Sequence, residues 1–361
     1  MIFIYYDVTE RDSLNMFSPK LRILTILFVL FYNISNAQVH TYKNIIFEGA
    51  GIRGIAYAGV LEEFEKAKLL ENITKVGGTS AGSIIALTLS LGYNAQEINQ
   101  LIYKTNFNKF NDGRFFFIGG IHRMNKNYGW YRGAKFSAWL EDLIDKKTGN
   151  SEITFSEFHD KGYRDLYITA TCLNKQKLLI FSYETYPDMK IKDAVRISMS
   201  IPLYFEAVFI DSAGTVIPKP GNRTDVDVVV DGGIIGNFPI QIFDSILSTA
   251  LNPITRIANP ETIGIRIDSD TQIKYDNSSK ELAPIQINDL SHYMEAFYSM
   301  VLENLNRNQL TPNDWKRSIS VSSANIGPRV KKLSPSQKES LINSGRKSAL
   351  QFLKAGNQLA E

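Results

Sequence analysis

Short apolar runs alternate with stretches of helical spacing at the start of the chain's globular part. Asn44 to Phe47 and Thr74 to Val76 are short and apolar enough for buried strands. Each run is followed after a glycine-containing turn by apolar residues at helical spacing, over residues 55–70 and 83–92. This strand–loop–helix order predicts an α/β fold with a parallel sheet covered by helices.

The same patterning predicts further elements as far as residue 353 and shows no internal repeat. The predicted segments are a helix at 133–144, adjacent strands at 165–174 and 176–184, a buried strand at 226–231, a strand at 262–268, and helices at 287–305 and 335–353. Residues 94–125 are polar and aromatic and indicate irregular structure, and residues 211–225 indicate a turn-rich surface excursion. We therefore expect one domain over residues 38–361.

The first 37 residues have a different character and resemble a secretory signal peptide. Lys20 and Arg22 form a basic entry, Ile23 to Tyr32 an apolar core, and residues 35–37 a small-residue cleavage site. Met16 is the more natural start, because the residues before it carry mixed charges. The apolar core is too short to span a membrane, although an N-terminal anchor or a core helix is the alternative. The prediction is export to a bacterial periplasm or envelope, or secretion.

Composition narrows the function classes. The 361 residues are 44% hydrophobic, ample for a large core, and the net charge of +3 gives no argument for nucleic acid as a partner. Cys172 is the single cysteine, so the chain has no internal disulfide and no cysteine-based metal cluster. Its place in a strand-like run predicts a buried, small apolar side chain.

A candidate nucleophile lies between the second strand and its helix. Residues 78–82 read Gly-Thr-Ser-Ala-Gly, the G-x-S-x-G form of a nucleophile elbow, in which Gly78 and Gly82 allow a sharp turn that exposes the hydroxyl of Ser80. The alternative is a glycine-rich loop in which Ser80 merely caps the following helix.

A second glycine motif, residues 49–54, joins the first strand to its helix. It matches G-x-G-x-x-G, which is typical of a dinucleotide site when an acidic residue ends the second strand. That strand ends in Val76-Gly77-Gly78, so the dinucleotide interpretation is weak. Converging amides of such a loop can instead stabilise an oxyanion, and Arg53 would be a positive neighbour of that site or a surface residue.

A serine nucleophile needs a base, and the histidines are poor candidates. Asp231 ends the buried strand, which we expect to deliver it to the sheet edge that carries Ser80; partial desolvation would raise its pKa and its basicity. A turn aspartate before two glycines is the alternative. His292 follows Ser80 and Asp231 in the order of a hydrolase triad, but it falls in a helical pattern. The other histidines are His40, beside the cleavage site, His122, in the irregular region, and His159, in an apparent polar turn.

These motifs together resemble the patatin-like phospholipase family. The glycine loop, G-T-S-A-G, and Asp231-Gly232-Gly233 followed by Asn237 occur in the family's order, and the likeness covers about residues 43–355. Ala50 departs from it, since a third glycine is common there. The resemblance implies a three-layer α/β/α fold with a mainly parallel sheet and a Ser–Asp dyad that needs no metal or cofactor.

Carried over residue by residue, the resemblance assigns the site. Ser80 is the nucleophile and Asp231 the general base of a lipid acyl hydrolase that acts through an acyl-serine. The amides of Gly49, Ala50, Gly51 and Ile52 form the oxyanion hole, with Arg53, Gly54, Gly78, Gly82, Gly232 and Gly233 in support. The implied partner is a lipid or phospholipid. A triad esterase that uses His292 and a non-catalytic lipid-binding protein are the alternatives.

The region from Phe107 to Trp130 combines aromatic and basic residues, and two interpretations fit it. Its phenylalanines, among them Phe110 and Phe115 to Phe117, and its cations, among them Arg123, could lie on a lipid interface. Alternatively, the aromatic rings pack into the core while the cations stay solvated.

Overall fold

The computed structural model describes residues 41–358, apart from 114–115, 219, 222, 250–251, 279–280 and 308. Residues 41–352 form one unit of the chain, and residues 353–358 belong to a second. Of the second unit only the last turns of helix α13 (Pro335–Gln358) are described. The predicted signal peptide, residues 1–37, and His40 lie outside the described residues.

A sheet of eight strands forms the centre of residues 41–352. Its order is β12-β11-β1-β2-β4-β8-β7, and β5 also pairs with β4. These strands are β1 (Asn44–Phe47), β2 (Lys75–Gly78), β4 (Asp165–Cys172), β5 (Lys177–Phe181), β7 (Val208–Ile210), β8 (Asp227–Asp231), β11 (Thr262–Asp268) and β12 (Ser318–Ser322). The five strands from β12 to β4 are mutually parallel, whereas β5, β7 and β8 pair antiparallel. The predicted mainly parallel sheet is confirmed.

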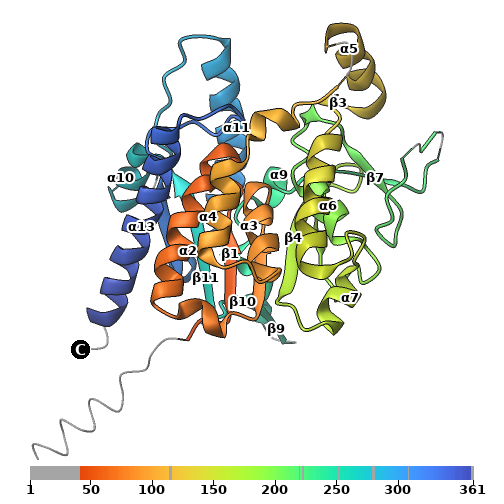
Figure 1. Cartoon of the computed structure of the whole chain (residues 1–361). Coiled ribbons are helices and arrows are strands. Elements are labelled where there is room, and N and C mark those ends of the chain that lie inside the picture. Colours follow the sequence, from red (N-terminus) through yellow and green to blue (C-terminus); the bar gives the residue numbers. More distant parts are fainter. Residues whose placement is uncertain are drawn as a thin grey trace, which may run out of the picture. The chain divides into compact units, whose positions relative to one another are not determined.

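Helices cover the sheet because its strands are apolar on both faces, as parallel strands usually are. One face carries α2 (Ala56–Lys66), α3 (Ala81–Ser90), α4 (Ala95–Lys104), α6 (Ala134–Thr148) and α13 (Figure 1). Every residue of α3 is buried. On the other face Phe238 and Ile240, from the segment after β8, pack on Ile46 of β1. The arrangement is the three-layer α/β/α fold expected from the sequence.

The remaining elements join or border these layers. They are η1 (Gly51–Ile55), η2 (Leu69–Asn72), η3 (Phe107–Phe110), α5 (Phe116–Asn127), β3 (Gly129–Tyr131), α7 (Phe155–Asp160), α8 (Ile191–Ser198), β6 (Leu203–Phe205), α9 (Gly233–Gly236), η4 (Ile240–Phe243), β9 (Ser245–Thr249), β10 (Asn252–Ile257), α10 (Asp270–Ser278), α11 (Leu290–Arg307) and α12 (Pro312–Lys316). Within the described residues, no helix combines the length and apolar character needed to cross a membrane.

The expectation of irregular structure over residues 94–125 was wrong. Asn94 caps α4: its side chain accepts the N–H of Glu97 at 2.8 Å, and the Glu97 carboxylate accepts the N–H of Asn94 at 2.8 Å. This capping box satisfies two amides of the first turn. Ala95, Ile98 and Ile102 form the buried stripe of the helix. The pattern was helical, and its many polar residues belong to the solvated face.

The polar turn expected around His159 was also wrong. Residues 155–160 form the short helix α7, which Thr154 and Glu157 begin with the same kind of capping box. Phe155 and Phe158 are buried, so the segment packs on the domain through its aromatic residues. Cys172, by contrast, is fully buried as expected.

Candidate active site

Ser80 occupies a strained turn between β2 and α3. Its backbone has φ 51° and ψ −123°, a region that residues with side chains seldom adopt. Hydrogen bonds on both sides fix this conformation: the Ser80 N–H donates to Oγ of Ser198 at 2.8 Å, and the Ser80 carbonyl accepts the N–H of Ser83 at 2.8 Å. Strain that the surroundings hold in place is characteristic of functional residues and matches the geometry of a nucleophile elbow.

The glycines flanking Ser80 lie where backbone segments come close together. Gly78 ends β2, and Gly82 lies in the first turn of α3. A Cβ atom at Gly82 would collide with the carbonyl oxygens of Phe47 and Glu48 in the neighbouring loop. Gly82 therefore lets the start of α3 approach the end of β1, where the other glycine motif begins.

Asp231 reaches Ser80 along an unexpected path through the sheet. Both β2 and β5 pair with Ile168 of β4, so they occupy opposite edges of β4. Because β5 also pairs with residues 170–172, β8 must use the edge that β2 occupies. Strands β2 and β8 thus approach each other end to end along one edge of β4.

The register explains why the two side chains meet. Gly78, at the end of β2, pairs with Ile168, and Asp231, at the end of β8, pairs with Ala170 two residues further along β4. Asp231 therefore arrives at the level of the serine turn although β8 runs antiparallel to β2. The expected position at the edge of the sheet was right, but the strand that delivers the carboxylate has the reverse direction.

Asp231 is a buried carboxylate that lines the same cavity as Ser80 and interacts with its hydroxyl. Burial raises its pKa from the usual 3.8 to about 7, against the opposing effects of hydrogen bonds from the Ser80 hydroxyl and the Gly233 N–H. The Gly233 N–H donates to Oδ1 at 2.8 Å. Oγ of Ser80 donates to Sδ of Met199 at 3.6 Å, which is a weak bond because a thioether is a poor acceptor.

The glycine loop turns beside Ser80 and leaves two amides unused. The N–H of Gly49 donates to the carbonyl of Asn237 at 2.9 Å, and the N–H of Ile52 donates to the carbonyl of Pro328 at 3.1 Å. Among the described residues, the amides of Ala50 and Gly51 have no acceptor. Of the four predicted donors, these two are the ones that can bind an oxyanion without first breaking a hydrogen bond of the fold.

The shape of this loop depends on Gly51. Its φ is +56°, in the left-handed region, and a Cβ atom there would collide with the carbonyl oxygen of Pro328. Arg53 supports the loop from within, because its Nε donates to the Ala50 carbonyl at 3.1 Å. Gly54 follows in η1 against Ala81, where a Cβ atom would lie 3.0 Å from the Ala81 Cβ.

A cavity of about 630 Å³ contains Ser80, Asp231 and the glycine loop. Its wall is mostly apolar and comes from segments that are far apart in the sequence. Its other lining residues are Arg53, Asn111, Tyr131, Ile201, Pro202, Tyr204, Ile234, Asn237, Leu290, Met294, Pro328, Arg329 and Val330. Mostly apolar walls with a few convergent polar groups are typical of a site for an apolar ligand.

The described histidines lie outside the cavity that contains Ser80 and Asp231. His292 lies in α11 as expected; its side chain is about half exposed, with Nδ1 3.0 Å from Oδ1 of Asp289, and it is not among the residues that line this cavity. His159 interacts with Asp165 at 2.6 Å and stacks on Tyr183. His122 is an exposed residue of α5. The described residues hold no cluster of three or more histidine, cysteine or acidic side chains suited to a metal ion.

The aromatic-basic region divides into buried and exposed parts. Phe110 is buried and packs on Phe136 and Trp139, with Phe107 beside it. Arg123 is also buried, and its Nε donates to the carbonyl of Trp130 at 2.8 Å. The side chains of residues 114–118, which include Phe115 to Phe117, lie outside the described part. Phe110 and Arg123 therefore belong to the core rather than to a lipid interface.

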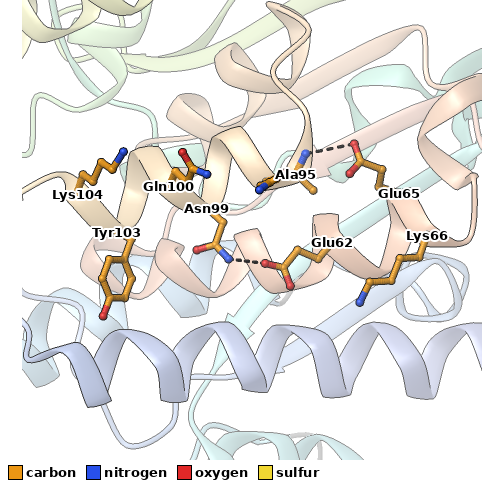
Figure 2. Close-up of a pocket in the computed structure, with 9 residues that line it drawn as sticks. Glu62, Glu65, Lys66, Ala95, Asn99, Gln100, Tyr103 and Lys104 are labelled. Atoms are coloured by element: carbon orange, nitrogen blue, oxygen red, sulfur yellow. Dashed lines mark hydrogen bonds between the residues drawn. The ribbon is translucent and has the colours of Figure 1, made fainter.

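A polar hollow between α2 and α4 has no comparable chemistry (Figure 2). Asn99 donates to the Glu62 carboxylate, which also pairs with Arg346, and the Ala95 N–H donates to Glu65 at 3.2 Å. These carboxylates hold neighbouring helices together, so they are already used by the fold.

Two hydrogen-bond acceptors that support the site could not be predicted from the sequence. Ser198, which accepts the Ser80 N–H, and Pro328, which fixes the glycine loop, are both far from the motifs they support. Ser198 ends α8 and lies 118 residues after Ser80 in the sequence. Nothing in the local sequence marks Pro328.

Comparison with known proteins agrees with the fold. The sequence model of the patatin-like phospholipase family matches residues 45–244. Uncharacterized protein R571 of Acanthamoeba polyphaga mimivirus is 28% identical over 88% of this chain and 95% of its own length. Probable lipid hydrolase 463L of Invertebrate iridescent virus 6 is 30% identical over 56% of this chain and 63% of its own length.

Among solved structures, VipD from Legionella pneumophila shares the fold. It aligns with a TM-score of 0.52 and 14% identity, over 88% of this chain and 67% of the other. The fold and these matches define the class of the protein as a lipid acyl hydrolase. More specifically, the chain belongs to the patatin-like phospholipase family.

Proposed function

We propose that this chain cleaves fatty-acyl ester bonds of lipids or phospholipids, with Ser80 as nucleophile and Asp231 as general base. The observation that carries the proposal is that the Ser80 hydroxyl and the buried Asp231 carboxylate share one cavity and interact there, beside two amides that have no acceptor among the described residues. A buried base with a pKa close to neutrality suits proton transfer at physiological pH.

In the first half-reaction the serine is acylated. The Ser80 hydroxyl transfers its proton to Asp231 while Oγ forms a bond to the ester carbonyl carbon. The amides of Ala50 and Gly51 donate to the oxyanion that develops, and the N-terminus of α3 adds a favourable dipole. Collapse of the tetrahedral intermediate breaks the ester C–O bond, and the leaving alcohol takes the proton from Asp231.

In the second half-reaction water replaces the alcohol. Asp231 accepts a proton from the water as the water oxygen attacks the acyl-serine carbonyl, and the same two amides stabilise the second oxyanion. Collapse breaks the bond to Oγ, the proton returns to Ser80, and the fatty acid leaves. The alcohol carries away the original Ser80 proton and a proton from water replaces it, so both residues are restored and the cycle consumes only ester and water.

The cavity supports a lipid as the substrate class. Its volume of about 630 Å³ and its apolar wall suit a long acyl chain, and burial of each methylene contributes roughly 0.8 kcal/mol. Arg53 and Arg329 also line the cavity and offer positive charge to a phosphate-bearing headgroup. The name of the viral relative, probable lipid hydrolase, points to the same substrate class.

The test is release of fatty acid from a lipid extract and of chromophore from a soluble acyl ester. Ser80→Ala removes the nucleophile, and we expect turnover of both substrates to fall by at least about a thousandfold. Ser90→Ala is the matched control, since Ser90 ends the same helix and its buried hydroxyl has no partner among the described residues. Equal turnover by wild type and Ser80→Ala would refute the proposal.

A further inference from the structure

Large apolar side chains are exposed along one stripe of α11 and just before it. Helix α11 lies beyond the carboxyl ends of the parallel strands (Figure 1). Leu290 is 75% exposed, and the exposed fractions of the others lie between 39% and 55%. We call this set the apolar face; it consists of Ile287, Leu290, Tyr293, Met294, Phe297 and Met300. A helix normally buries such a stripe, and a contiguous exposed one indicates a binding surface.

The apolar face is continuous with the catalytic cavity. Leu290 and Met294 belong to both, because they line the cavity that contains Ser80 and Asp231. Whatever covers the apolar face therefore also lies at the mouth of the cavity. An apolar substrate held against this surface lies next to the cavity.

A short basic stretch borders the same mouth. Arg329 and Val330 line the cavity, directly after Pro328, which holds the glycine loop. Arg329, Lys331 and Lys332 are exposed. Asp289, an exposed carboxylate next to Leu290, interacts with His292 at 3.0 Å. The charge at the mouth thus favours an anionic partner.

We infer that the apolar face and residues 329–332 dock on the surface of a phospholipid bilayer that contains anionic headgroups. Apolar side chains of such a surface enter the boundary between headgroups and acyl chains, while neighbouring cations contact the headgroups. The inference rests on the proposed function, because a lipid hydrolase must receive its substrate from such a surface. It adds α11 to residues 107–130 as a surface for lipid contact.

The test measures vesicle binding and soluble-ester turnover separately. Ile287→Ser with Tyr293→Ser removes two exposed apolar side chains that do not line the cavity. We expect this double variant to bind phosphatidylcholine–phosphatidylglycerol vesicles about tenfold more weakly in co-sedimentation. Turnover of a soluble short-chain ester should stay at the wild-type level. Lys331→Gln with Lys332→Gln should lose the gain in binding that phosphatidylglycerol provides.

The β9–β10 hairpin offers a matched control. Ile246 and Leu247 are 71% and 50% exposed, and the hairpin lies near the opposite end of the sheet (Figure 1). Ile246→Ser with Leu247→Ser removes a similar apolar area and should bind vesicles as the wild type does. Equal losses in both double variants, or unchanged binding by Ile287→Ser with Tyr293→Ser, would overturn the inference.

The outcomes also separate this inference from the proposed function. Vesicle binding through the apolar face without any ester turnover would refute the proposed function and leave the docking surface standing. Ester turnover together with vesicle binding that does not depend on the apolar face would support the proposed function and refute the docking surface. Sedimentation velocity tests whether the face instead binds a second copy of the chain. If the wild type is a dimer, and Ile287→Ser with Tyr293→Ser dissociates it without changing vesicle binding, the inference is overturned.

Discussion

Gly49 and Asn237 hold each other by two hydrogen bonds. The Gly49 N–H donates to the Asn237 carbonyl at 2.9 Å, and Nδ2 of Asn237 donates to the Gly49 carbonyl at 3.0 Å. Gly49 begins the glycine loop, and Asn237 follows the short helix α9, which comes after the strand that ends at Asp231. The pair therefore fixes the proposed oxyanion donors relative to the proposed base, across 188 residues of sequence.

Asn237→Ala should lower kcat more than it raises KM. It removes the Nδ2 donor and frees the start of the loop, so we expect kcat to fall about ten- to a hundredfold with KM nearly unchanged. Asn174→Ala is the matched control: Asn174 also bridges backbone segments, by bonds to Val226 and Val228, but it does not line the cavity. Equal effects of the two variants on kcat would contradict a positioning role for Asn237.

Gly51→Ala should impair the oxyanion hole. The new methyl group would meet the Pro328 carbonyl and force the loop, with its two free amides, out of place. Loss of one such donor typically costs about a hundred- to a thousandfold in kcat. Gly149→Ala controls for backbone strain, because Gly149 also has a positive φ but nothing lies near its Cβ position. Steady-state kinetics on a soluble ester measure both, and comparable activity of the two variants would exclude the loop as oxyanion hole.

The pH dependence of the reaction should report Asp231. The base must be deprotonated to accept the Ser80 proton, and burial raises its pKa to about 7. We expect kcat/KM to rise about tenfold per pH unit below this pKa and to level off above it. The profile of a soluble ester, measured over the range in which the enzyme stays folded, provides the check. A profile that is already flat near the usual pKa of an aspartate, 3.8, would contradict the account.

The same buried carboxylate should cost stability at high pH. The folded state holds the Asp231 proton up to about pH 7, whereas an unfolded aspartate loses it near 3.8. Between these values the folded state binds more protons, so raising the pH through this window destabilises it relative to the unfolded state. Asp231→Asn removes the titration.

The gain in unfolding free energy from Asp231→Asn should therefore grow by about 3 kcal/mol between roughly pH 5 and pH 8. Urea unfolding of both proteins at the two pH values measures this difference. Asn174→Asp is the control: it introduces a carboxylate in place of an amide at a site outside the cavity, and so measures the general effect of a carboxylate on stability. A gain that is independent of pH would mean that Asp231 is ionised in the folded state throughout.

The sequence was most informative where a local rule determines the geometry. The turn at Ser80 follows from glycines that flank a serine between a strand and a helix, and the structure has the strained backbone that this pattern implies. The helix that follows Asn94 was also predictable, since Asn94 and Glu97 have the spacing of a capping box. The many polar residues of this segment led instead to a prediction of irregular structure.

The remainder depends on tertiary structure that no local pattern encodes. The meeting of Ser80 with Asp231 requires β2 and β8 to share one edge of β4, which follows from pairing register rather than from strand composition. Likewise, which loop amides stay free depends on Asn237 and Pro328, whose carbonyls take up the amides of Gly49 and Ile52. Motif order alone suggested four equivalent donors.

Labelling with a fluorophosphonate probe tests the central claim most directly, because the probe reacts only with an activated serine. Peptide mapping should find the adduct on Ser80 in the wild type and, at a similar rate, in His292→Ala. Asp231→Asn should react at least about a hundredfold more slowly than the wild type, because the amide cannot accept the hydroxyl proton. An adduct on another serine, or a rate that depends on His292 and not on Asp231, would contradict the account.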